Sequence, residues 1–75
     1  MIDDRLKKVF SEIFKLSTNK INESTSSDSI DRWDSLSHLK LIMAVEKEFN
    51  IQFKTDLIPN LSSFKIIKEY LQKVQ

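Results

Sequence analysis

The sequence contains no cysteine and no glycine, and it has only one proline and one histidine. Without cysteine no disulfide can form, and His38 with scattered carboxylates offers too few ligands for a zinc site, so we expect no metal. The tight two-residue turns of β-hairpins usually need glycine, and its absence argues against a β fold. Leu, Ile, Lys and Glu are plentiful instead, which predicts an all-α fold stabilised by helix packing.

The sequence also lacks a strong excess of charge and a long hydrophobic run. It has 12 Lys and Arg residues against 11 Asp and Glu residues, a formal net charge of +1. Nucleic-acid-binding proteins usually carry a strong basic patch, so we expect no nucleic-acid partner. The longest apolar run, Leu41 to Val45, is far shorter than the roughly 20 residues of a membrane span. No apolar signal core stands near the start, so we predict one cytoplasmic, monomeric domain over residues 1–75.

Apolar side chains at helical spacing predict a first helix, which Asp3 or Asp4 caps. Its apolar face consists of Leu6, Val9, Phe10, Ile13 and Phe14. Residues 17–34 are rich in Ser, Thr, Asn and Asp, which favour turns, and they predict a long loop. Three apolar residues interrupt this loop: Ile21, Ile30 and Trp33. We expect them to hold it against the helices as an ordered segment.

A second helix is predicted from Asp34 or Ser35 to Phe49 or Asn50, since Asn suits a helix end. Its expected inner face consists of Leu36, Leu39, Ile42, Met43 and Phe49, widened by Leu41 and Val45.

The remainder of the chain predicts two more helical segments. Asp56 to Asn60 is expected to form a single turn, because Pro59 limits its length. Ser62 or Ser63 is expected to cap the last helix. The face of that helix consists of Phe64, Ile67, Leu71 and Val74, widened by Tyr70.

The sequence offers no convincing active site. An enzyme needs a nucleophile with its base, paired carboxylates or a metal site. His38 is the only histidine, the carboxylates are scattered, and a glycine-rich phosphate loop cannot form. We therefore predict that the chain is not an enzyme.

One short motif, Asp34-Ser35-Leu36, lies where the long loop meets the second helix. At the first turn of a helix, unpaired backbone N–H groups and the positive end of the helix dipole stabilise a phosphate group. Ser35 is therefore a candidate for carrying a phosphate-linked group. The alternative is that Asp34 or Ser35 only caps the helix, and the tripeptide alone does not decide between them.

The wider pattern resembles the acyl and peptidyl carrier protein family. The stretch WDSLSHLKLIMAVEKEFNIQF, residues 33–53, is similar to that family's signature helix and the segment after it. Asn60-Leu61-Ser62-Ser63-Phe64 resembles the entry into the family's last helix, and the first helix and long loop match in length and order. The resemblance implies a four-helix bundle with three main helices, one short helix and a long loop between helices one and two.

In that family a separate phosphopantetheinyl transferase attaches 4′-phosphopantetheine from coenzyme A to the serine of Asp-Ser-Leu. Carried over, the resemblance implies Ser35 as the attachment residue, Asp34 as its neighbour and Leu36 as the residue packed behind it. The arm ends in a thiol, the group that this cysteine-free chain lacks for a thioester. The implied function is an acyl carrier that serves acyl-activating and acyl-transferring enzymes, with a fatty acyl, an aminoacyl or another acid as its cargo.

The second helix departs from the carriers of fatty-acid synthesis, which present carboxylates there to basic patches on enzymes. Because charge complementarity governs encounter rate and partner choice, we expect Lys40 to weaken recognition by standard fatty-acid synthase enzymes. We therefore predict a specialised pathway of lipid biosynthesis or secondary metabolism. The candidate partner contacts are Trp33, Ser37, His38, Lys40 and Leu41. The alternative for Trp33 is that it packs the loop against the core.

The resemblance also implies that a small carrier of this family can hold an acyl chain between its helices. The candidates for lining such a cavity are Leu39, Met43, Ile67 and Leu71. Plain core packing is the alternative, and it is the usual role of an apolar helical stripe.

Two other functions remain open at the level of sequence. A small helical protein-interaction domain without a prosthetic group would use Ser35 only as a cap. A DNA-binding helical domain would need Lys and Arg clustered on one face, whereas those of this chain are dispersed.

Overall fold

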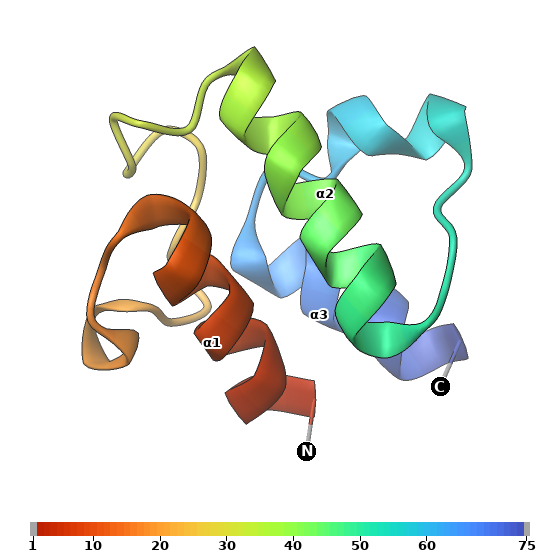
Figure 1. Cartoon of the computed structure of the whole chain (residues 1–75), viewed down its shortest axis with the longest axis horizontal. Coiled ribbons are helices and arrows are strands. Elements are labelled where there is room, and N and C mark those ends of the chain that lie inside the picture. The colour runs from red at the N-terminus through yellow and green to blue at the C-terminus, as the bar shows by residue number, and fades with distance from the viewer. Residues whose placement is uncertain (1, 75) are drawn as a thin grey trace.

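The structure, a computed structural model, describes residues 2–74 and contains three α-helices. These are α1 (Ile2–Phe14), α2 (Ser35–Phe49) and α3 (Phe64–Val74), and the connections hold two 3-10 helices, η1 (Thr18–Lys20) and η2 (Thr55–Asn60). α1 packs against both α2 and α3, and α3 lies behind them in the view of Figure 1. The predicted all-α bundle of three main helices, one short helix and a long loop is confirmed. η1, inside the long loop, is an element that the sequence did not predict.

One hydrophobic cluster joins the helices and the long loop. On α1 the cluster contains four of the five predicted residues: Leu6, Val9, Phe10 and Phe14. The fifth, Ile13, is only partly buried. The ring of Phe10 lies near the middle of this cluster, with its centroid 5.2 Å from that of Phe64 in α3. Ile67 and Leu71 of α3 are fully buried, whereas Val74 is 48% exposed. The buried face of α3 therefore ends one turn before the helix does.

The buried face of α2 differs from the predicted one. Its buried side chains form an inner stripe: Leu41, Ile42, Val45 and Phe49. Its exposed apolar side chains form an outer stripe: Leu36, Leu39 and Met43, which are 64%, 52% and 67% exposed. The predictions that the outer stripe faces the core and that Leu36 packs behind Ser35 are therefore wrong. The physical reason is that α2 carries apolar residues on two opposite sides, and α1 packs against the side of the inner stripe.

The long loop between α1 and α2 is held by the entry to α3. The N–H of Ser27 donates to the carbonyl of Ser62 at 2.9 Å, and the N–H of Phe64 donates to the carbonyl of Thr25 at 2.8 Å. The three predicted anchors are all buried: Ile21, Ile30 and Trp33. The prediction of an ordered loop is therefore confirmed, and its order has both a hydrophobic and a hydrogen-bonded cause.

The helix ends are formed without glycine. Asn50, directly after α2, has left-handed backbone angles (φ 54°, ψ 50°), as expected of an Asn at a helix end. Lys15, directly after α1, also has a positive φ of 58°, although Lys has no intrinsic preference for it. At the start of α3, the hydroxyl of Ser63 accepts the N–H of Ile66 at 3.1 Å. Of the two predicted caps, Ser63 is therefore the one that forms.

Neither a membrane-crossing helix nor a metal cluster is found within residues 2–74. No helix there combines the length and the hydrophobicity that a membrane span requires. The same residues contain no group of three or more His, Cys, Asp or Glu side chains that could hold a metal ion.

The variants Leu41→Ala and Leu39→Ala apply the same truncation to opposite sides of α2. Leu41 is fully buried, so its truncation leaves a cavity and should lower the free energy of unfolding by about 2–5 kcal/mol. Leu39 is 52% exposed, and its truncation should cost no more than about 1 kcal/mol. Urea denaturation of both variants measures the difference. Equal losses would contradict the assignment of the two faces.

Candidate functional site

The N-terminus of α2 is capped by Asp34. Its backbone is extended (φ −101°, ψ −173°), and its carboxylate accepts the N–H of Ser37 at 2.9 Å. The backbone N–H of Ser37 and then the Ser37 hydroxyl stabilise the charged carboxylate, and they hold the pKa of Asp34 below its ordinary value of 3.8. Asp34 thus satisfies one of the backbone donors that every helix start leaves unpaired.

Ser35 is the first residue of α2, and it is exposed. Because Asp34 supplies the cap, the hydroxyl of Ser35 has no capping role. Among the described residues, this hydroxyl makes no hydrogen bond with the protein. The predicted alternative, a helix cap formed by Asp34 or Ser35, is confirmed for Asp34, and it leaves the Ser35 hydroxyl without a structural role in the cap.

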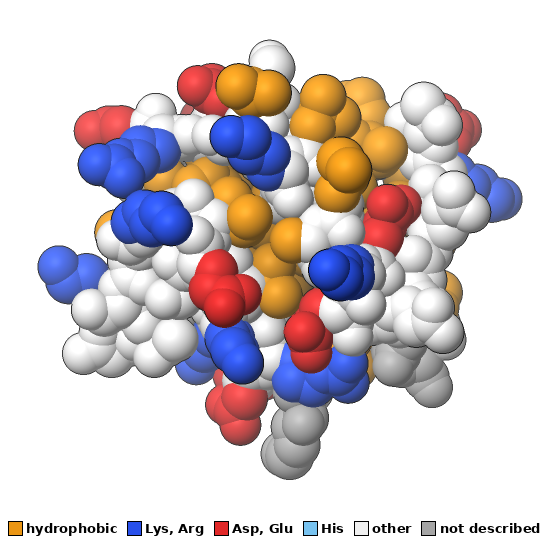
Figure 2. Space-filling model, viewed as in Figure 1, with side chains coloured by type: hydrophobic (Ala, Val, Ile, Leu, Met, Phe, Trp, Pro, Cys, Tyr) orange, Lys and Arg blue, Asp and Glu red, His pale blue; other side chains and the backbone are white. Residues whose placement is uncertain are grey.

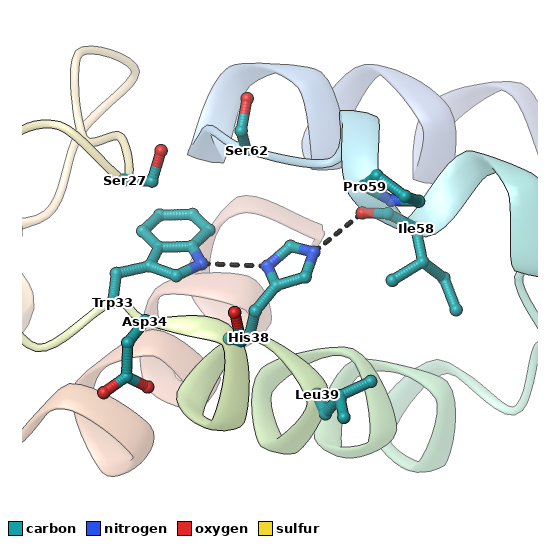
Figure 3. A pocket seen from close by; sticks show the side chains of 9 residues that line it. Ser27, Trp33, Asp34, His38, Leu39, Ile58, Pro59 and Ser62 are labelled. Carbon is teal, nitrogen blue, oxygen red and sulfur yellow. Dashed lines mark hydrogen bonds between the residues drawn. The ribbon is translucent and has the colours of Figure 1, made fainter.

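An open groove of about 560 Å³ lies beside Ser35. The groove runs between the N-terminal turns of α2, the end of the long loop and η2. Its lining consists of Ser27, Trp33, Asp34, Ser35, His38, Leu39, Ile58, Pro59 and Ser62. Figure 3 shows Trp33, His38 and Ile58 in a row across it, with Ser27 and Ser62 on one side of the row and Leu39 on the other. The groove therefore combines apolar surface with hydroxyl groups.

Trp33 forms one wall of the groove and is itself part of the core. Its side chain is 7% exposed, and its ring lies 5.5 Å from that of Phe10 in an edge-on arrangement and 5.2 Å from that of Phe14. The prediction of Trp33 as a partner contact is therefore wrong for most of its side chain, because α1 covers it. The alternative, packing of the loop against the core, is confirmed.

The indole N–H of Trp33 donates to Nδ1 of His38 at 2.8 Å. The two rings are inclined by 24° with their centroids 5.9 Å apart, which is the geometry of an in-plane hydrogen bond rather than of a face-to-face stack. On the other side of the imidazole, Nε2 lies 2.7 Å from the carbonyl oxygen of Ile58. Indole nitrogen can only donate and a carbonyl can only accept, so in this geometry Nδ1 of His38 accepts and Nε2 donates.

The remaining predicted site residues do not form one group. Leu41 is fully buried in the inner stripe, so its prediction as a partner contact is wrong. Ile67 and Leu71 are buried in the core, whereas Leu39 and Met43 lie on the outer stripe. These four residues therefore do not line a common cavity, and the alternative of core packing holds for the two on α3. Ser37 and His38 are half-buried and Lys40 is exposed.

No sequence signal indicated the groove's far wall, which consists of Ile58 and Pro59. The two lie some twenty residues after Ser35, and only the fold brings η2 beside the start of α2. Ser27 and Ser62 were also missed as lining residues, because their approach depends on the pairing of the long loop with the entry to α3.

Comparison with known proteins shows a relative whose sequence aligns with this chain over nearly the entire length of both. No protein-family model matches this chain. Among curated proteins, the acyl carrier protein of Buchnera aphidicola subsp. Baizongia pistaciae (strain Bp) is 39% identical over 75 aligned positions. The alignment covers 93% of this chain and 95% of that relative.

Two variants of Asp34 separate the cap from its charge. Asp34→Ala removes the acceptor, whereas Asp34→Asn keeps an oxygen acceptor without a charge. A carboxyl group whose pKa falls on folding stabilises the protein above its unfolded pKa, and the contribution is lost as the pH falls through the lower folded pKa. Asp34→Ala should therefore unfold at a lower urea concentration than the wild type at pH 7, and the gap should close progressively below pH 3.8.

Urea titrations of the wild type and both variants at several pH values measure this gap. The difference between the Asn and Ala variants should not change with pH, since neither side chain titrates. A gap between wild type and Asp34→Ala that stays constant on acidification would show that the charge contributes nothing to the cap.

Proposed function

Because this chain belongs to the acyl carrier protein family, we propose that it carries acyl groups as thioesters on a 4′-phosphopantetheine arm attached to Ser35. The acyl carrier role follows from the family, and the choice of Ser35 rests on the Asp34-Ser35-Leu36 motif, supported by the geometry at the start of α2. When bound, the arm supplies the thiol that a chain without cysteine lacks. A separate phosphopantetheinyl transferase attaches it, so the carrier needs no catalytic residues of its own and is not an enzyme.

The observation that carries the proposal is that Asp34, and not Ser35, caps α2. The Ser35 hydroxyl can therefore be modified without the loss of a structural hydrogen bond. A phosphate on Ser35 would lie at the first turn of a 15-residue helix, where backbone N–H groups and the helix dipole stabilise negative charge. The folded protein then tolerates the modification, as a carrier must.

The groove beside Ser35 fits an arm of this chemistry. A pantetheine chain combines amide groups with methylene and methyl groups. The hydroxyls of Ser27 and Ser62 make no hydrogen bond with the described protein, and each can donate to or accept from an amide. Ile58 and Pro59 offer apolar contact on the far wall. These four residues would hold the arm against the protein between encounters with enzymes.

The outer stripe of α2 supplies the proposed surface for partner enzymes. Leu36, Leu39 and Met43 are spaced three and four residues apart, so they project from one side of α2, and Lys40 is exposed among them. Figure 2 shows hydrophobic side chains gathered at the upper end of α2 and toward η2, with basic side chains close by. An apolar and partly basic surface suits enzymes that do not rely on a strongly basic docking patch. It supports a specialised pathway over general fatty-acid synthesis.

The first test is loading. Purified protein incubated with coenzyme A and a broad-specificity phosphopantetheinyl transferase should gain the mass of one phosphopantetheine, measured on the intact protein. Ser35→Ala should gain nothing, and its helical circular dichroism should stay unchanged. Ser37→Ala is the matched control in the same helical turn, and it should be loaded.

A mass gain in the Ser35→Ala variant would show that the arm is attached to a residue other than Ser35. If several transferases left the folded wild type unmodified, the carrier proposal would fail, and a helical interaction domain without a prosthetic group would take its place.

The outer stripe is tested with the same transferase as a model partner. Truncating Leu39 and Met43 together to Ala should raise the KM for the carrier roughly tenfold with little change in kcat, because apolar docking contacts are lost while Ser35 is untouched. Ile66→Ala is the control, since Ile66 is also exposed (42%) but belongs to α3. Equal KM values for both variants would remove the outer stripe from the docking surface.

A further inference from the structure

η2 is tied to α2 by few hydrogen bonds. At the end of η2 the carbonyl of Ile58 accepts the N–H of Leu61, the residue that follows η2, at 3.2 Å, which is a local bond. Before η2 begins, the N–H of Phe53 donates to the carboxylate of Glu46 near the end of α2 at 2.8 Å. Among the described residues, the bond from His38 to Ile58 is the one that ties η2 itself to the N-terminal half of α2. Ile58 also packs against the core, but the hydrogen-bonded link between η2 and the start of α2 runs through His38.

His38 also reaches the opposite wall of the groove. Its Nδ1 accepts the indole N–H of Trp33, while its Nε2 donates to Ile58. Both walls are thus bonded to one small rigid ring, and Figure 3 shows this ring between them. The spacing between the Trp33 wall and the η2 wall is then set by the width of an imidazole with a hydrogen bond on each side.

This bridge needs a side chain that accepts on one side and donates on the other. Lys and Arg only donate, and ionised Asp and Glu only accept. Neutral His in one tautomer meets the requirement, and so does the amide of Gln. An imidazole with protons on both nitrogens would set two donors against each other at Trp33. The bridge therefore specifies a tautomer as well as a residue.

We propose that His38 is a positioning residue of the prosthetic-group site: as the neutral Nε2–H tautomer it holds Trp33 and η2 apart at one spacing and so shapes the groove beside Ser35. For the occupant of the groove, this inference rests on the proposed function. The bridge itself does not. His38 takes no part in bond formation at Ser35, because both of its ring nitrogens are occupied by Trp33 and Ile58.

Two substitutions distinguish the effect of the two His38 hydrogen bonds from the effect of the volume that the side chain fills. His38→Leu removes both hydrogen bonds, whereas His38→Gln keeps an acceptor and a donor. In hydrogen exchange by NMR on the unmodified protein, His38→Leu should speed exchange of the Trp33 indole N–H and of the Leu61 amide by roughly 5- to 10-fold, the effect of one or two lost hydrogen bonds. Amides at the centre of α1 serve as the reference for global stability. His38→Gln should restore most of the protection.

Ring nitrogen spectra of the wild type at pH 7.5 provide an independent readout. They should show Nε2 protonated and Nδ1 not. A proton on Nδ1, or equal exchange in the Leu and Gln variants once α1 is taken as reference, would overturn the bridge.

The loaded protein then tests the effect on the arm. An environment-sensitive fluorophore attached to the arm's thiol should show lower anisotropy in His38→Leu than in the wild type, with His38→Gln close to the wild type. If the wild type takes no arm, the proposed function fails while the exchange data still decide the bridge. If the arm loads and its anisotropy is equal in all three proteins, the bridge has no bearing on the groove's occupant, and the positioning role is refuted.

Discussion

The hydrogen bond from the Trp33 indole to His38 is the link on which the arrangement of the site depends. The rings of Phe10 and Phe14 pack against the indole ring of Trp33. This packing sets the orientation of the ring and therefore the direction of its N–H group. A buried N–H without a partner is costly, and His38 is the group that meets it. His38 in turn carries the constraint to η2. The packing of α1 against Trp33 therefore influences the position of the η2 wall of the groove, although no residue of α1 lines the groove.

α2 has three roles, and each uses a different part of its surface. Its inner stripe packs in the core, its outer stripe faces solvent, and its first turn presents the serine. The roles do not compete, because the cap lies one residue before the helix and leaves the Ser35 hydroxyl unused. A change in the outer stripe can therefore alter the surface that we propose for partner recognition without altering the fold.

The sequence predicted the local structure and the buried faces of α1 and α3 well, but it predicted the buried face of α2 poorly. The bounds of α2, the Asn50 helix end and the three loop anchors follow from caps and isolated apolar residues, whose signals are short-range. The inner face of α2 did not follow, because Leu36, Leu39 and Met43 repeat with the same period as the buried residues and only contact with α1 separates the two sets. Ser35 is proposed as the attachment residue from its motif, and that assignment stays a prediction. The His38 bridge could not be, since its partner Ile58 is twenty residues away and joins through a backbone carbonyl that leaves no mark in the sequence.

If Ser35 carries the arm and the outer stripe binds the partner enzymes, as we propose, the closeness of the two limits how many enzymes can use this protein at once. From Ser35 to Met43 α2 rises by about 12 Å, whereas a specific interface buries about 800 Å² on each partner. An enzyme that reaches Ser35 therefore covers the stripe completely, and a second one is excluded until the first departs. On that proposal, enzymes that share this carrier would act in succession, and the slowest dissociation would set an upper limit on the flux through the whole route. Short-lived complexes are then a requirement of the architecture, and a partner that bound too tightly would act as an inhibitor of all the others.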